Sequence, residues 1–188
     1  MDNPSFMNDS SRNNHGYEAM LDFQMSWLLR VAMGHSNPKL LSIARKVLLK
    51  MINREVYSEA EIKRVEVWKQ WARIDLTAEI DVVIDNKLEH HIVVIENKAY
   101  TFIHDDQLSR YKKTIDEYYH NNIWKKTEKH FWVITFFDPS EEGYGILEEQ
   151  CKDSDWKLID FYSVIDWKEG FEKTDSDLFD EFWLKTWY

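Results

Sequence analysis

Two apolar segments joined by a polar turn decide the fold of this chain. The first is Asp81-Val82-Val83-Ile84, the turn is Asp85-Asn86-Lys87, and the second is Ile92-Val93-Val94-Ile95-Glu96-Asn97-Lys98. Aspartate and asparagine favour turns, so the pattern predicts a β-hairpin. The run from Ile92 to Ile95 is apolar at every position, which is typical of a central strand that is buried on both faces.

The second strand ends in Glu-x-Lys, and its charges suggest a chemistry. Because side chains alternate faces along a strand, Glu96 and Lys98 are expected to point the same way. Asp81 lies 15 positions before Glu96, which is enough for two short strands and a turn. Two carboxylates and an ammonium on one surface can hold a divalent cation and polarise a water beside it. The alternative is a surface salt bridge between Glu96 and Lys98 at the strand end.

A helix from about residue 104 to 121 is predicted to follow, with Asp105 or Asp106 as its cap. Gln107 and Tyr111 are four positions apart and therefore share a face of this helix. A strand that ends in Glu-x-Lys and leads into a helix opening with Gln-x-x-x-Tyr is much rarer than either part alone.

In these residues the chain resembles the PD-(D/E)XK nuclease superfamily, the restriction-endonuclease-like fold. The matching positions are Asp81, then Glu96-Asn97-Lys98, then Gln107-Leu108-Ser109-Arg110-Tyr111. They look particularly similar to a bacterial branch with an I-E-N-K strand and a Q-L-x-R-Y helix. In that branch a helical glutamate precedes an apolar run, and Glu18 before Trp27-Leu28-Leu29 has this form. The resemblance covers about Tyr17 to Pro139 and implies an α/β fold, with a central mixed sheet of four to five strands flanked by helices.

The position of the motif aspartate leaves an alternative open. In that branch the aspartate often follows an arginine by two positions, and Arg73-Ile74-Asp75 has this form, 21 positions before Glu96. Asp81 is preferred, because Asp75 would need a much longer hairpin. The alternation from residue 74 to 85 nevertheless predicts one long strand with an acidic face, on which Glu79 is a secondary ligand or a charge beside the substrate.

The resemblance implies roles for the site residues. Asp81, Glu96, the Asn97 carbonyl and Glu18 would hold Mg²⁺ or Mn²⁺, whose protein ligands are mostly oxygens. Lys98 would orient or help deprotonate the attacking water, or steady the charge of the transition state. Gln107 and Tyr111 would hydrogen-bond Lys98, the water or a substrate phosphate. The alternatives are a solvent-facing charge for Glu18 and helix packing for Gln107 and, above all, Tyr111.

The composition is that of a globular protein. With 188 residues, 44% of them apolar, the chain is expected to form one domain over residues 17–188, after a disordered leader over residues 1–16. No apolar run reaches the length of a membrane span, and the first residues lack the regions of a signal peptide. Cys151 is the only cysteine, so an internal disulfide is excluded and a reducing cytoplasm fits.

The net charge of −10 is unusual for a protein that binds nucleic acid. The cationic residues cluster around the predicted helix and the segment after it, at Arg110, Lys112, Lys113, Lys125, Lys126 and Lys129. This pattern indicates either a basic rim around the active site or ordinary solvated helix faces. His90 and His91 are adjacent in a strand, so they face opposite ways, and a place near the turn predicts solvent exposure for both.

Further elements complete the predicted fold. Helices are expected at 17–33 and from Pro38 to about Asn53, and strands at 62–71, 74–85, 91–98, 131–137 and 156–161. Ser163 is expected to cap a short helix, and Asp175 or Ser176 to begin a last one.

The function expected from these features is metal-dependent hydrolysis of phosphodiester bonds in nucleic acid, in DNA more than in RNA. No separate reader domain fits this length, which favours a homodimer or a protein partner. The alternative is a catalytically silent binding or regulatory module with the same fold, which would act through a partner.

Overall fold

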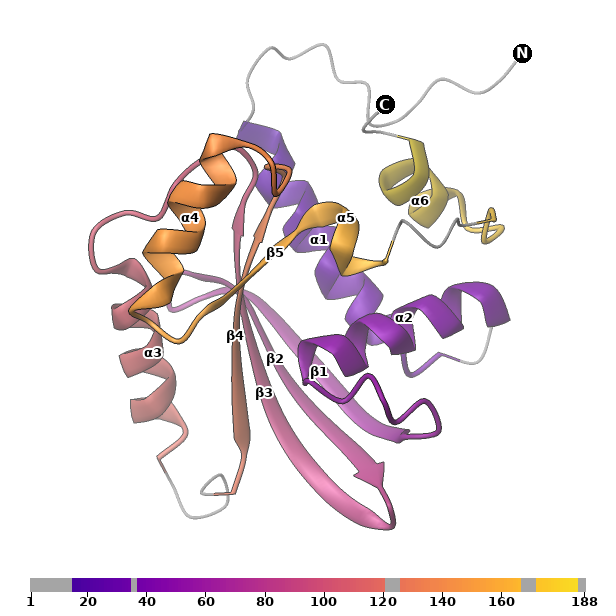
Figure 1. Cartoon of the computed structure of the whole chain (residues 1–188). Helices are drawn as coiled ribbons and strands as arrows, with labels where there is room; N and C mark the ends of the chain where they lie inside the picture. Colours follow the sequence, from indigo (N-terminus) through magenta and orange to yellow (C-terminus); the bar gives the residue numbers. More distant parts are fainter. Residues whose placement is uncertain (1–14, 35–36, 121–125, 167–171, 186–188) are drawn as a thin grey trace.

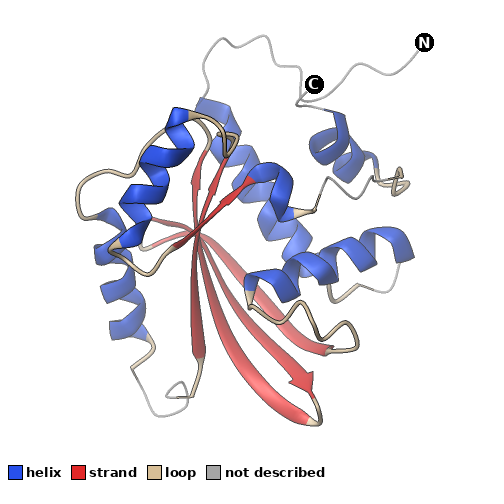
Figure 2. Cartoon of the chain, in the orientation of Figure 1, coloured by secondary structure: helices blue, strands red, loops and turns tan. Residues whose placement is uncertain are grey.

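The structure, a computed structural model, describes residues 15–34, 37–120, 126–166 and 172–185 (Figure 1). The predicted leader, residues 1–16, lies almost wholly outside the described residues. Five strands form one sheet in the order β1-β2-β3-β4-β5, with helices on both faces (Figure 2). This is the α/β architecture with a mixed central sheet that the sequence predicts.

The sheet changes direction at its middle strand. β1 (Glu61–Trp71), β2 (Ile74–Ile84) and β3 (Lys87–Lys98) are antiparallel neighbours. β4 (Glu128–Thr135) and β5 (Lys157–Asp160) continue from β3 in parallel. β3 is therefore the central strand, as its continuous apolar run predicts, and Ile92 to Ile95 are fully buried.

The β2–β3 hairpin is longer than the sequence suggests. β3 begins at Lys87 rather than near residue 91, so only Asp85 and Asn86 remain in the turn, and both have positive φ. Two-residue hairpin turns with this backbone match the twist of the strands they join, and aspartate and asparagine tolerate it. The length of the hairpin decides which acidic residue of β2 reaches the end of β3.

One face of the sheet is covered by α1 (His15–Val31) and α2 (Pro38–Met51), together with the C-terminal helices. Pro38 stands at the start of α2, where its missing N–H is not needed. Alternate positions of β3, Val93 and Ile95, join the core on this face, while Ile92 and Val94 face the other way. The two faces of β3 thus meet different helices.

The second face is covered by α3 (Gln107–Tyr118) and α4 (Glu142–Lys152), which connect the parallel strands. Two parallel connections of the same hand place both helices on one face of the sheet. The sequence prediction missed α4, because Gly143 and Gly145 in its first turn and its many acidic residues weaken the helical pattern. Gly143 packs so closely on the Phe137 ring that a Cβ would collide with it.

The C-terminal region follows the prediction in outline. Ser176 caps α6 (Asp177–Phe179), which continues as one π-helical segment, Asp180–Lys185. α5 (Phe161–Val164) is capped by Asp160, whose side chain accepts from the Ser163 N–H, so the prediction that Ser163 is the cap was wrong. None of the helices in the described part of the chain has the length and hydropathy of a membrane span.

Candidate functional site

The charged pair at the end of β3 lies where strand geometry predicts it. Glu96 and Lys98 share the face of β3 that packs against α3, and Lys98 Nζ lies 2.7 Å from Glu96 Oε1. Both side chains are almost fully buried, Glu96 with 2% and Lys98 with 8% exposed. A buried ion pair differs from the surface salt bridge that the sequence left open, because its charges are not solvated by bulk water.

The structure brings Asp75, not Asp81, to this pair. Within the β2–β3 register Asp81 pairs with His90, and the Asp81 carboxylate lies 2.7 Å from the His90 ring. Asp75 lies six residues earlier, roughly 20 Å along the strand. Its Oδ2 accepts a 2.9 Å hydrogen bond from the backbone N–H of Asn97. The expectation that Asp81 would meet Glu96 was wrong, because it assumed a short hairpin. β2 and β3 pair along their full length, which places Asp81 far from Glu96.

Helix α1 adds two more carboxylates from the opposite face of the sheet. Glu18 Oε1 accepts from the backbone N–H of Ala99 at 3.1 Å and from the Thr101 hydroxyl. Asp22 lies one helical turn later, and its Oδ1 accepts from Asn97 Nδ2 at 2.6 Å. The residues that carry acidity to the end of β3 therefore come from three elements: α1, β2 and β3.

Gln70 and Asn97 connect these carboxylates to one another. Gln70 Nε2 donates to Asp22 at 3.2 Å and to Asp75 at 3.0 Å. Asn97 donates through its backbone to Asp75 and through its side chain to Asp22. The sequence analysis missed Asp22 and Gln70. Asp22 was open to prediction, because it follows Glu18 by four residues and so shares its helix face, whereas nothing in the sequence singles out Gln70.

Helix α3 supplies the polar cover on the other side. Gln107 Nε2 donates to Glu96 Oε1 at 2.5 Å and to the Tyr111 hydroxyl at 2.9 Å, and Tyr111 in turn donates to the Arg73 carbonyl. The two side chains therefore meet as their spacing predicts, but they contact Glu96 and the β1–β2 turn rather than Lys98. In this arrangement they hold Glu96 and the residues before Asp75 in place.

The site carries more negative than positive charge. Burial, with Asp75 nearby, raises the pKa of Glu96 to about 8, against the opposing effect of Lys98. Burial and Asp75 likewise raise the pKa of Asp22 to about 6. Burial by itself would lower the pKa of Lys98, but Glu96, Glu18 and Asp75 together raise it, so the ammonium stays charged. Burial is the main cause of these shifts, and Glu18, Asp75 and Glu96 add negative charge around Lys98.

The donor set is suited to a divalent cation. Glu96 Oε1 already accepts from Lys98 and Gln107, whereas Glu96 Oε2 is buried without a hydrogen-bond partner. A buried carboxylate oxygen without a partner is unfavourable, and a hard cation next to Asp75 would satisfy it. Glu96, Asp75 and Glu18 are therefore the residues of this group that fit Mg²⁺ or Mn²⁺.

Two other predicted features lie apart from this group. Glu79 accepts from the Tyr119 hydroxyl and pairs with Arg64 at 2.7 Å, so it is engaged in the sheet rather than free to serve as a ligand. Four of the basic side chains on and near α3 have acidic partners: Arg110 with Asp106, Lys112 with Asp155, Lys113 with Glu117 and Lys129 with Asp116. Lys125 lies outside the described residues. These pairs favour solvated helix faces over a free basic rim.

The prediction that both histidines near the turn are exposed was wrong for His91, which is only 1% exposed. Its ring lies against His130 from β4. The two histidines do face opposite ways, since His90 contacts Asp81 instead. β3 begins at Lys87, four residues before His91, rather than near residue 91 as the sequence suggested. His91 therefore lies within the sheet, under the loop that follows α2.

The mixed sheet and the carboxylate–lysine group at the end of its central strand define a protein of the restriction-endonuclease-like class. A family model described as the PD-(D/E)XK nuclease superfamily matches residues 5–181, and the chain belongs to this superfamily. Nucleases of this superfamily depend on divalent metal ions. Comparisons with curated proteins and with solved structures gave no match. The bacterial branch suggested by the I-E-N-K strand stays a prediction.

Proposed function

We propose that this protein is a metal-dependent nuclease that hydrolyses phosphodiester bonds in DNA, with Mg²⁺ or Mn²⁺ as cofactor. The observation that carries the proposal is the buried, unpartnered Glu96 Oε2 beside Asp75 and Lys98. Such an arrangement leaves a position for a cation next to an ammonium that can act on a phosphate. Asp75 takes the place of the motif aspartate, in preference to Asp81.

Each residue has a role that follows from its contacts. Asp75, Glu96 and Glu18 would hold the metal, which when bound would polarise the phosphate and lower the pKa of a water. Lys98 lies against Glu96 and places positive charge where the pentavalent phosphate develops negative charge. The Asn97 backbone orients Asp75 through its N–H. Gln107 orients Glu96 and leaves its second oxygen free.

The charges around the site set limits on how DNA can bind. The ion-paired cations on α3 give little free positive charge for a phosphate backbone. DNA binding is therefore expected to depend on the bound metal, and to gain from a second copy of the chain or a protein partner. A cytoplasmic location is part of the same proposal and fits the unpaired Cys151.

The test is a cleavage assay with the purified protein. Supercoiled plasmid, linear duplex, single-stranded DNA and RNA are each incubated with Mg²⁺, Mn²⁺ or EDTA, and Lys98→Ala is assayed in parallel to exclude a contaminating nuclease. We expect DNA cleavage that needs the metal and is lost in the variant. Equal cleavage by Lys98→Ala would overturn the proposal. Absence of cleavage under every condition would overturn the proposal in favour of the silent binding module.

A further inference from the structure

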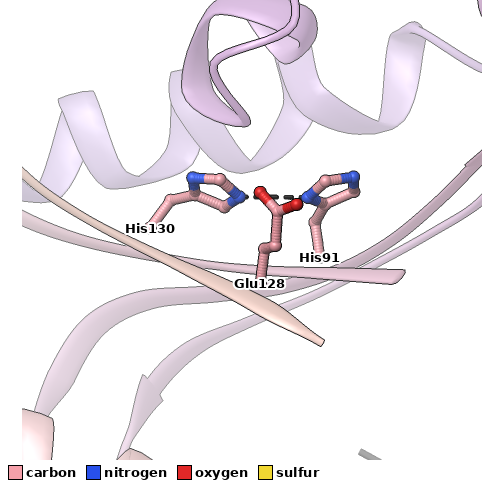
Figure 3. Close-up of side chains that lie close together, drawn as sticks. All are labelled: His91, Glu128 and His130. Atoms are coloured by element: carbon pink, nitrogen blue, oxygen red, sulfur yellow. Dashed lines mark hydrogen bonds between the residues drawn. The ribbon is translucent and has the colours of Figure 1, made fainter. Parts of the chain in front are cut away.

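A second group of metal-ligating side chains lies at the start of β4 and the neighbouring part of β3. His91, Glu128 and His130 converge there, and the two imidazole rings face each other in Figure 3. The parallel register pairs His91 with Glu128, and His130 follows two residues later on the same face of β4. One ligand atom from each residue lies within 4.8 Å of the others.

The two rings share a single hydrogen bond at the centre of this group. His91 Nδ1 and His130 Nε2 lie 3.0 Å apart, and both side chains are buried, with 1% and 6% of their residue surface exposed. At the outer ends, Asn53 Nδ2 lies 2.8 Å from His130 Nδ1, and His91 Nε2 lies 3.2 Å from Glu89. With Asn53 as donor and Glu89 as acceptor, one proton remains between the two rings, which are then both neutral.

We propose that His91, His130 and Glu128 form a binding site for Zn²⁺ or a similar transition-metal ion, separate from the carboxylate group at the end of β3. The ion replaces the proton between His91 Nδ1 and His130 Nε2. Neutral imidazole nitrogens suit Zn²⁺, whereas Mg²⁺ prefers oxygen ligands. The two polar groups on β3 therefore select different metals. This inference does not rest on the proposed nuclease function.

The distances allow such an ion with small movements. Zn–N bonds of about 2.0–2.1 Å in a tetrahedral site place two nitrogens roughly 3.3 Å apart. His91 Nδ1 and His130 Nε2, now 3.0 Å apart, need to separate by a few tenths of an ångström, and both rings need to turn so that the two nitrogens point at one ion. The Glu128 side chain is half exposed, so its carboxylate can turn toward the ion and a water can take the fourth position.

The surrounding residues already resemble an outer shell. A histidine that binds a metal usually donates its other ring N–H to a carboxylate or carbonyl. Glu89 is in place to accept from His91 Nε2. Arg54 holds Glu89 at 2.9 Å and Glu128 Oε1 at 2.6 Å, which leaves the second oxygen of Glu128 for the ion. The two carboxylates offset the positive charge that Arg54 adds beside the metal.

One side of the shell has to change when the ion binds. His130 would coordinate through Nε2, so its Nδ1 would carry a proton and need an acceptor. Rotation of the Asn53 amide by 180° presents Oδ1 to that proton. Lys157, which donates to Asn53 Oδ1 and lies over the Trp132 ring in the present arrangement, is exposed and can turn into solvent. The two histidine ligands are therefore already side by side, and the hydrogen bonds of Asn53 rearrange when the ion binds.

The position of the site indicates a structural role. The ion would join β3 to β4, next to the loop that follows α2. Glu96 and Lys98 lie at the C-terminal end of β3 and on the opposite face, because Glu96 follows Ile92 and Val94 in the alternation. Metal binding at the histidines is thus expected to stabilise the fold without taking part in phosphodiester cleavage.

The test is zinc binding to the whole chain, freed of metal with a chelator and kept in millimolar Mg²⁺ to occupy the carboxylate group. Isothermal titration with ZnCl₂ is compared for the wild type, His130→Asn, Glu128→Gln and Glu96→Gln. We expect one tight zinc site in the wild type and in Glu96→Gln. Affinity is expected to fall at least about 100-fold in His130→Asn and about 10-fold in Glu128→Gln. Co²⁺ in place of Zn²⁺ is expected to give the visible absorption of a tetrahedral site, lost in His130→Asn.

The Glu128→Gln variant distinguishes loss of zinc binding from misfolding. Its side chain is half exposed, so Glu128→Gln is expected to fold as the wild type does and to have the same melting temperature without zinc. Zinc is expected to raise the melting temperature of the wild type clearly more than that of this variant. Zinc affinity that is equal in the wild type, His130→Asn and Glu128→Gln would overturn the proposal, as would the absence of tight zinc binding to the wild type.

Discussion

The two polar groups on β3 differ in how well their hydrogen bonds are satisfied. At the end of the strand, Glu96 has a buried oxygen without a partner and a carboxylate neighbour in Asp75. Near residue 91, every ring nitrogen of His91 and His130 has a partner. The group around Glu96 has excess negative charge, whereas the two histidine rings are neutral and all their nitrogens are hydrogen-bonded.

This difference separates a group built for reaction from one built for stability. Excess negative charge is unfavourable in the free protein, and a cation or a substrate phosphate with its metal relieves it. A hydrogen-bond network in which every ring nitrogen has a partner supports the fold without a bound metal. The same strand therefore combines both kinds of polar group, about five residues apart, on its two faces.

The largest effect expected is on catalysis, in a comparison of Asp75→Asn with Asp81→Asn. Both changes remove one carboxylate from β2, but only Asp75 lies against the end of β3. We expect Asp75→Asn to lower the cleavage rate at least about 100-fold, because a metal ligand is lost, and Asp81→Asn to change it by less than about threefold. The rates are measured on plasmid DNA at saturating Mg²⁺. The opposite ranking would restore Asp81 as the motif aspartate.

Much of this comparison could be read from the sequence, and the missing part has one physical cause. The continuous apolar run before Glu96 predicts the central strand, and alternation places Glu96 with Lys98. The choice between Asp75 and Asp81 depends on strand register, which is set by where the turn lies. Asp85-Asn86-Lys87 indicated the turn, but the extension of β3 back to Lys87 is only visible in the pairing.

Long-range contacts explain the other omissions. Asp22 and Gln70 meet only because α1 crosses the β1–β2 hairpin. His91 and His130 are separated by 39 positions and become neighbours through the parallel pairing of β3 with β4. α4 escaped prediction partly because Gly143 weakens its helical pattern, and the close packing of Gly143 on Phe137 is a tertiary contact that the sequence does not reveal.

The next effect concerns stability, through the pH dependence of the metal-free protein. The pKa of Glu96 is raised from 4.5 to about 8 in the fold, so its contribution is most favourable below pH 4.5 and is lost as the pH rises toward 8. Glu96→Gln removes this loss. In EDTA we expect the variant to be more stable than the wild type at pH 8.5 by a few kcal/mol, and by much less at pH 5. Urea unfolding at both pH values measures the difference.

A control separates this effect from a general response to charge. Glu61→Gln removes an exposed carboxylate of β1 and should leave the pH dependence as in the wild type. Mg²⁺ should also flatten the wild-type pH dependence, since it binds the ionised carboxylates. A Glu96→Gln protein that loses stability between pH 5 and 8.5 as steeply as the wild type would contradict the conclusion that ionisation of the buried Glu96 destabilises the fold.

A smaller effect is expected at the histidine end of the comparison, from Arg54→Ala. Arg54 pairs with both Glu89 and Glu128, and its side chain is only 20% exposed. Its removal is expected to lower the free energy of unfolding by roughly 1–2 kcal/mol without changing the cleavage rate. Lys63→Ala, which breaks an exposed pair with Glu61, serves as the control and should change stability by less than about 0.5 kcal/mol. A fall in cleavage without a fall in stability would link the two groups.

The smallest expected effect is on stability, when a residue with positive φ in each of the two hairpin turns is replaced by glycine. The β1–β2 turn beside Asp75 contains Ala72 with φ 53°, and the β2–β3 turn at the far end of the sheet contains Asn86 with φ 62°. Alanine is strained at positive φ, whereas asparagine adopts it readily. We expect Ala72→Gly to raise stability by about 0.5–1 kcal/mol, because the relief of strain exceeds the added entropy of the unfolded chain, and Asn86→Gly to leave it nearly unchanged. Urea unfolding of both variants measures this.

Equal effects would show that the turn beside Asp75 carries no special strain. A stabilised Ala72→Gly protein that also cleaves more slowly would show that this backbone helps to hold Asp75 against Asn97, since the Arg73 carbonyl that Tyr111 binds follows directly after Ala72.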